Sequence, residues 1–196
     1  AEEKDTTMSL LRGILFRFNE LGFETGEFNM NMNSDVLPGS GLSSSASIEI
    51  LIGTALSELF NKGAVDFVKV AQIGQFAENN FFGKASGLMD QVACASGGVV
   101  GIDFKDPETP VIKPVNYSFN KKKYKLMVIA VGSSHANLSD EYSAIPVEMF
   151  EVAKNLGKKT CRELVMSDLH KNVNMLREKC GDRAVLRAYH FINENK

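Results

Sequence analysis

A glycine- and serine-rich segment, which separates a strand-like stretch from a helix-like one, constrains the fold of this chain more than any other feature. Glycine allows positive backbone φ angles and a close approach of the backbone to a ligand. The apolar spacing that follows predicts a helix of about four turns, whose N-terminus would present free N–H groups and the positive end of the helix dipole. The segment therefore predicts a phosphate-binding loop. Its residues are Pro38, Gly39, Ser40, Gly41, Leu42, Ser43, Ser44, Ser45 and Ala46.

This loop matches neither of two common nucleotide-binding motifs. It has no Gly-Lys-Ser/Thr as in a Walker A loop, and Ser44 stands where G-x-G-x-x-G requires its third glycine. The plainer interpretation is a loop in which a serine caps the following helix.

Hydrophobic periodicity along the rest of the chain predicts a mixture of helices and strands. Helices are predicted over residues 6–21, 48–60, 66–80 and 90–95, and strands over 26–33, 99–104 and 125–131. After Pro146 the pattern is helical, over 147–156, 159–165, 167–179 and 183–196. This mixture predicts an α+β fold.

Two carboxylates stand on either side of a second glycine-punctuated stretch. Glu78 lies near the end of one predicted helix, and Asp90 begins the next, with Gly83 and Gly87 between them. A carboxylate can hold a divalent cation through oxygen, as Mg2+ prefers, or accept a proton from a hydroxyl nucleophile. Spacing alone favours a plainer interpretation, in which Glu78 is a solvated helix-end residue and Asp90 a helix N-cap.

A polar loop over residues 132–142 follows the apolar strand predicted over 125–131. Tyr142 offers a ring face and a hydroxyl that suit a sugar. His135 lies in the same loop, but a lone loop histidine is more often only hydrogen-bonded than a base, and its role stays open.

The charge balance and the cysteines exclude several classes of protein. The 22 Lys and Arg nearly cancel the 24 Asp and Glu, and a net charge of −2 gives no reason to expect nucleic acid or an acidic membrane as partner. No apolar run approaches the roughly 20 residues that span a bilayer. Three scattered cysteines exclude a disulfide framework and a cysteine zinc site, so we expect a reducing cytoplasm. Because both terminal helices look cut, we also expect a piece of a longer protein.

Taken in order, these segments resemble the GHMP kinase superfamily, which includes galactokinase, homoserine kinase and mevalonate kinase. Residues 38–47 look like its phosphate loop in the galactokinase form G-x-G-L-S-S-S-A-S, and residues 77–91 look like the galactokinase stretch that ends in G-[IL]-M-D-Q. The resemblance covers essentially the whole chain. It implies the α+β GHMP kinase fold, with a ribosomal protein S5 domain 2-like N-terminal part. Residues 1–120 would form a partial ATP-binding domain and residues 121–196 the start of the C-terminal domain.

The resemblance also implies ATP-dependent phosphorylation of the anomeric hydroxyl of a sugar, by default galactose, with ATP and Mg2+ bound in the site. At matching positions, Asp90 corresponds to the catalytic base that contacts the sugar. Ser45 and Glu78 correspond to the magnesium ligands, and the backbone of residues 39–44 to the segment that wraps the phosphates. Tyr142 corresponds to a tyrosine that contacts the sugar. Small molecules are thus the implied partners, and the oligomeric state stays open.

The sequence departs from the family pattern in three places. The family's N-terminal substrate motif and C-terminal glycine-rich motif have no counterpart here, and Ser86 stands where a cysteine is common. We therefore expect this chain alone to be inactive. Three alternatives stay open: another GHMP sugar 1-kinase, for example for N-acetylgalactosamine; a non-catalytic galactokinase-like sensor of galactose and ATP; and a structural α+β domain. The intact serine segment and Asp90 disfavour the sensor.

Overall fold

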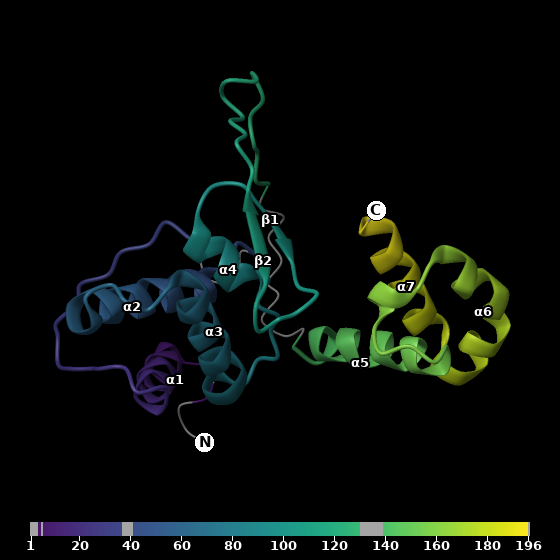
Figure 1. Cartoon of the computed structure of the whole chain (residues 1–196), viewed down its shortest axis with the longest axis horizontal. Coiled ribbons are helices and arrows are strands. Elements are labelled where there is room, and N and C mark those ends of the chain that lie inside the picture. Colours follow the sequence, from purple (N-terminus) through teal and green to yellow (C-terminus); the bar gives the residue numbers. More distant parts are fainter. Residues whose placement is uncertain (1–3, 5, 37–40, 130–138, 196) are drawn as a thin grey trace. The chain divides into compact units, whose positions relative to one another are not determined.

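The computed structural model describes the chain outside residues 1–3, 5, 37–40, 130–138 and 196 (Figure 1). The chain forms two compact units, residues 1–137 and 138–196, each with its own apolar core. The first unit contains α1 (Thr7–Glu20), α2 (Ser44–Asn61), α3 (Phe67–Ala77), η1 (Glu78–Phe82), α4 (Met89–Ser96), β1 (Val100–Asp103) and β2 (Val111–Pro114). The second contains α5 (Ser139–Asn155), η2 (Cys161–Glu163), α6 (Met166–Cys180) and α7 (Asp182–Glu194).

Helix α1 begins and ends where its sequence predicts. The Thr6 hydroxyl accepts a backbone N–H of the first turn at 3.2 Å, as a threonine N-cap does. Gly22 follows the helix with a φ of 80°, a left-handed conformation that glycine adopts at little cost. Ile14 and Phe18 are fully buried in the core that α1 shares with α2 and α3. The predicted helix over residues 6–21 is confirmed.

Helix α2 has 18 residues and buries only part of its apolar residues, Ile52 and Leu56 among them. Leu51 and Leu59, which the apolar pattern placed on the buried face, are exposed. The face that packs inward also contains Glu49 and Gly53. A side chain at Gly53 would lie 2.7 Å from a methyl group of Val70, so glycine there lets α2 approach α3 closely. The hydrophobic pattern alone does not identify Glu49 and Gly53 as part of the buried face.

Helix α3 starts after the N-cap Asp66, where the helix predicted over residues 66–80 begins, and continues into a π-helical turn. The Asp66 carboxylate accepts the N–H groups of Val68 and Lys69, both at 3.0 Å. At its C-terminal end α3 passes directly into the π-helix η1, which Gly83 ends with a φ of 93°. Single π-helical turns often occur at functional sites, and Glu78 is the first residue of this one.

Two strand predictions are wrong for the described residues, and one is confirmed. Residues 26–33 and 125–129 are irregular, and Figure 1 shows the chain beyond β2 extending away from the helices of the first unit. Leu126 and Ile129 are both 76% exposed, whereas a buried strand was predicted. No described segment pairs with either stretch, and a strand needs a partner for its N–H and C=O groups. The strand predicted over residues 99–104 is confirmed as β1, which pairs antiparallel with β2.

The second unit is helical, with different boundaries from those predicted. Helix α5 starts before Pro146 and contains it, although proline donates no hydrogen bond within a helix. The helix predicted over residues 159–165 is only the short turn η2, whereas α6 and α7 confirm the last two predictions. Arg183 and Arg187 of α7 both pair with Glu148 of α5, at 2.6 and 2.7 Å. In the described part of the chain, no helix is long and apolar enough to cross a membrane.

Candidate functional site

The carboxylate of Glu78 lies at the centre of a buried polar cluster in the first unit. Its side chain is almost fully buried, and its Oε1 atom accepts the Ser45 hydroxyl at 2.8 Å and the Lys84 ammonium at 3.0 Å. Its Oε2 atom accepts the amide of Gln91 at 2.9 Å. Side chains from α2, α4 and the loop after η1 thus meet at one carboxylate. The interpretation of Glu78 as a solvated helix-end residue is wrong.

The start of α2 turns a serine hydroxyl toward this carboxylate. Ser43 is the N-cap residue and lies in the left-handed region at φ 60°, but its side chain makes no capping hydrogen bond. Ser45, in the first turn, donates to Glu78 instead. The plain serine-cap interpretation therefore does not describe this helix. Gly41 has a φ of 77°, as the loop prediction requires, and Pro38, Gly39 and Ser40 lie outside the described residues.

A second carboxyl group, Glu49, lies fully buried on α2 and shares a hydrogen-bond donor with Glu78. The Nε2 atom of Gln91 donates to Glu49 Oε2 at 3.0 Å and to Glu78 Oε2 at 2.9 Å. Burial, together with the nearby charge of Glu78, raises the pKa of Glu49 to about 8. Glu49 is therefore protonated at neutral pH, which avoids the cost of burying a second negative charge here.

The two carboxyl groups of the cluster differ in charge at neutral pH. Burial alone would raise the pKa of Glu78, but the hydroxyls of Ser86 and Ser45 and the ammonium of Lys84 outweigh it and lower this pKa. Glu78 is thus an anion beside a neutral Glu49. Neighbouring acids whose pKa values move in opposite directions are typical of functional sites.

Glu49 should make the unfolding free energy depend on pH between about 4.5 and about 8. In this range the folded chain keeps a proton on Glu49 that the unfolded chain releases. The stabilisation is complete below about pH 4.5 and is lost as the pH rises through about 8, by up to about 1.4 kcal/mol per pH unit. Glu49→Gln keeps the shape and carries no titrating proton, so it should remove this slope. Urea unfolding across this range would check it, and equal slopes in the two proteins would contradict the protonation of Glu49.

Asp90 lies in the first turn of α4 and is only half-buried. The N-cap of this helix is Leu88, so the interpretation of Asp90 as an N-cap is wrong. Its carboxylate has no hydrogen bond or ion pair to another described residue. A carboxylate at a helix N-terminus is favoured by the dipole, and this one stays available to a ligand.

The loop that separates Glu78 from Asp90 is held at its centre by side-chain amides. The Asn79 amide oxygen accepts the N–H of Ser86 at 2.7 Å, and the Gln75 amide donates to the Ser86 carbonyl at 3.1 Å. These bonds fix the path of the chain between the two candidate carboxylates. The Ser86 hydroxyl, at the position where the resemblance predicts a cysteine, also lies 3.3 Å from Asn79 Oδ1.

The oxygen atoms around Glu78 fit a magnesium ion. A hydroxyl oxygen of Ser45 and a carboxylate oxygen of Glu78 lie 2.8 Å apart, and Mg2+ prefers oxygen ligands while keeping several waters or phosphate oxygens. No group of three or more His, Cys, Asp or Glu side chains among the described residues is arranged to hold a metal.

The polar segment predicted over residues 132–142 contains Tyr142, the predicted sugar contact, and His135, whose role stays open. Tyr142 lies in α5 rather than in a loop, and its side chain is exposed. His135 lies outside the described residues.

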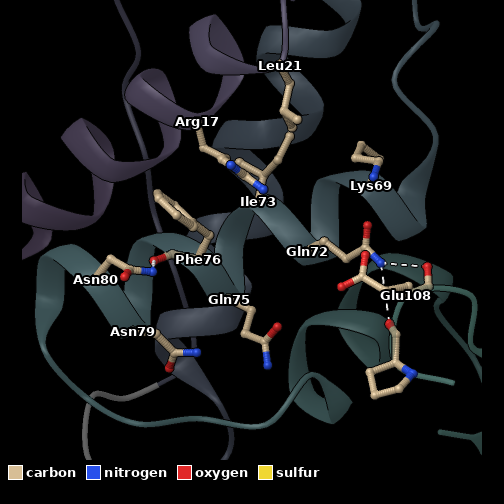
Figure 2. Close-up of a pocket in the computed structure, with 11 residues that line it drawn as sticks. Arg17, Leu21, Lys69, Gln72, Ile73, Gln75, Phe76, Asn79, Asn80 and Glu108 are labelled. Carbon is tan, nitrogen blue, oxygen red and sulfur yellow. Dashed lines mark hydrogen bonds between the residues drawn. The ribbon is translucent and has the colours of Figure 1, made fainter. Parts of the chain in front are cut away.

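A cavity of about 230 Å³ lies between α1, α3 and the β1–β2 turn (Figure 2). Gln72 donates to the carbonyls of Pro107 and Glu108, at 3.4 and 2.9 Å, and so fixes one wall. The cavity is separate from the Glu78 cluster, because neither Ser45 nor Glu78 lines it. The sequence did not predict it, although amide side chains recur along one side of α3.

The sequence of this chain is similar to a known protein family and to several curated proteins. Residues 9–98 match the family described as GHMP kinases N terminal domain. The galactokinase of Thermotoga petrophila is 30% identical over 186 residues, which cover 95% of this chain and 50% of that protein. The galactokinase of Limosilactobacillus reuteri is 29% identical over 194 residues, or 96% of this chain and 48% of that protein. That of Lactobacillus helveticus is 36% identical over 132 residues, or 67% and 33%. The chain spans about half the length of the curated relatives it matches.

Proposed function

Because residues 9–98 of this chain belong to the GHMP kinase N-terminal domain family, we propose that the protein is a sugar kinase that transfers a phosphoryl group from ATP to the anomeric hydroxyl of galactose. The observation that carries the proposal is the hydrogen bond between Ser45 and Glu78, 33 residues apart, which joins the start of α2 to η1. Galactose is chosen because the matching relatives are galactokinases.

The start of α2 is the proposed phosphate site. Its N-terminal N–H groups and dipole favour an anion, and the left-handed Ser43 leaves the first turn without a side-chain cap from that residue. Ser45 and Glu78 would hold Mg2+, and a bound Mg2+ would offset the charge that builds up on the transferring phosphoryl group. Gln91 holds the second oxygen of Glu78 and so orients the carboxylate.

Asp90 is the proposed catalytic base. It would accept the proton of the anomeric hydroxyl as that oxygen attacks the terminal phosphorus of ATP, a role that needs an accessible carboxylate without a competing partner. The neighbouring Gln91 anchors α4 to Glu78, so the base and the cation site are held by one short helix. Tyr142 is the proposed sugar contact in the second unit.

Replacing Ser45 by alanine should raise the magnesium concentration required for half-maximal activity by about tenfold or more, because the ion loses one oxygen ligand. Ser96→Ala is a matched control, since that hydroxyl donates only to carbonyls of its own helix. A magnesium titration of both variants at fixed ATP checks the assignment. An unchanged titration in Ser45→Ala would remove Ser45 from the ligand set.

The proposed function itself is tested on the complete protein that contains this sequence. Incubation with Mg-ATP and galactose, followed by phosphorus NMR, should show galactose 1-phosphate and ADP, and omission of magnesium should prevent both. Phosphorylation of galactose at another hydroxyl would support the kinase activity but contradict transfer to the anomeric hydroxyl. ATP that stays intact although both ligands bind would contradict the proposal.

A further inference from the structure

Lys84 contacts Glu78 through both its backbone and its side chain. Gly83, with a φ of 93°, turns the chain after η1, and the Lys84 N–H then donates to the carbonyl of Glu78 at 3.1 Å. The side chain folds back in the same direction and places its Nζ 3.0 Å from Glu78 Oε1. An ammonium group is therefore fixed against the central carboxylate of the candidate site.

The ammonium contacts an oxygen atom that is a proposed metal ligand. The oxygen that Lys84 contacts, Glu78 Oε1, is the same atom that accepts the Ser45 hydroxyl. Glu78 Oε1 and the Ser45 hydroxyl oxygen are the proposed magnesium ligands, so the ammonium and a divalent cation would compete for contact with Glu78 Oε1. A carboxylate as buried as Glu78, at 2% side-chain exposure, requires a counter-charge, and Lys84 supplies it.

The two partners differ in how easily they can move. Glu78 is held from the other side by Gln91, whereas the Lys84 side chain is 39% exposed and lies on a loop between two glycines. Lys84 can therefore swing into solvent without opening the core, while the carboxylate stays in place. Such an arrangement permits exchange of one cation for another at a fixed anion.

We infer that Lys84 is an internal counter-ion that occupies the cation position at Glu78 until a divalent cation displaces it. The inference rests on the proposed function in one respect, which is that Glu78 binds the cation. Its consequence is quantitative: the apparent affinity for the divalent cation equals the intrinsic affinity multiplied by the fraction of molecules in which the Lys84 ammonium has moved away from Glu78. Removal of the ammonium should therefore tighten binding of the free cation, whereas removal of a lysine that only binds phosphate should leave it unchanged.

Lys84→Met tests this, because methionine keeps most of the side-chain length and removes the charge. Binding of Mn2+ to the complete protein, measured by electron paramagnetic resonance without nucleotide, should tighten about five- to tenfold. Lys113→Met, which removes an exposed lysine on β2, should leave the affinity unchanged. In the presence of a chelator, Lys84→Met should unfold at a lower temperature than the wild type, and saturating Mn2+ should remove most of that difference.

Two further measurements separate the inference from its premise. If Lys84 competes with Mn2+ by direct contact with Glu78, salt screens that competition only weakly. The tightening of Mn2+ binding in Lys84→Met should then be similar at about 0.15 M and about 0.5 M KCl, whereas the effect of a distant charge would be screened. Glu78→Gln should abolish Mn2+ binding, and retention of binding would overturn both the ligand assignment and the inference. If Glu78→Gln loses binding while Lys84→Met binds as the wild type does, or more weakly, the inference is wrong and the proposed function stands.

Discussion

Asp90→Asn should lower the rate of sugar phosphorylation by about 10²- to 10⁴-fold, the usual contribution of a positioned general base, and leave ATP affinity nearly unchanged. Asparagine has the same shape as aspartate but cannot accept the proton of the attacking hydroxyl. ATP binding is expected to persist because Asp90 has no hydrogen bond or ion pair to another described residue, so the exchange disturbs no contact of the Glu78 cluster. The complete protein is assayed for ADP release, with nucleotide affinity measured separately by calorimetry.

Asp106→Asn is the control for this experiment. Asp106 is an exposed carboxylate in the β1–β2 turn, where its Oδ1 accepts the N–H of Glu108 at 3.0 Å. Asparagine retains that acceptor, so turnover should stay at the wild-type level. Near-normal turnover in Asp90→Asn would show that Asp90 is not the base. Loss of ATP binding in Asp90→Asn would show that Asp90 maintains the structure of the site instead.

Phe18→Ala should cost the chain about 3–5 kcal/mol of unfolding free energy, because Phe18 is the largest fully buried side chain among the described residues. The Phe18 side chain is 0% exposed and lies in the core that α1 forms with α2 and α3. Its ring contacts Phe23, with centroids 5.7 Å apart. Alanine would leave a cavity that the surrounding helices can fill only in part.

Phe16→Ala, two residues away on the same helix, is the matched control. Phe16 is 50% exposed and contacts only the rings of Phe76 and Phe81 among the aromatic side chains described. Its loss should cost about 1.5 kcal/mol or less. Urea unfolding followed by circular dichroism checks both variants. Equal losses would contradict the placement of Phe18 in the core and of Phe16 at the surface.

Local signals in the sequence were reliable where the structure is determined locally. The caps at Thr6 and Asp66 act within one helical turn, and each lies at the first residue of a helix that the sequence predicted, over residues 6–21 and 66–80. The strand predicted over residues 26–33 failed because alternation describes which side chains face a core, whereas a strand also requires a neighbour that can lie far away in sequence. The period of two was present, but the partner was not found among the described residues.

The candidate site was predicted in part, for the same reason. Ser45, Glu78 and Asp90 were identified because they lie in recognisable motifs. Glu49 and Gln91 were missed as a pair, since they lie 42 residues apart and meet only when α2 packs against α4. The one available signal was a glutamate on the inward face of a helix, at helical spacing from Gly53. A charged residue at such a position indicates a buried polar partner elsewhere in the chain.

The most direct test of the central claim is ADP release by the complete protein with Mg-ATP, measured in parallel with galactose, N-acetylgalactosamine, glucose, mevalonate and homoserine. We predict release that depends on galactose and on none of the others at comparable concentration. ADP release with only one other compound of this set would support a kinase that acts on that compound instead of galactose. No release with any of them, in a protein that still binds ATP and galactose, would contradict the claim and favour a sensor that uses the same site without catalysis.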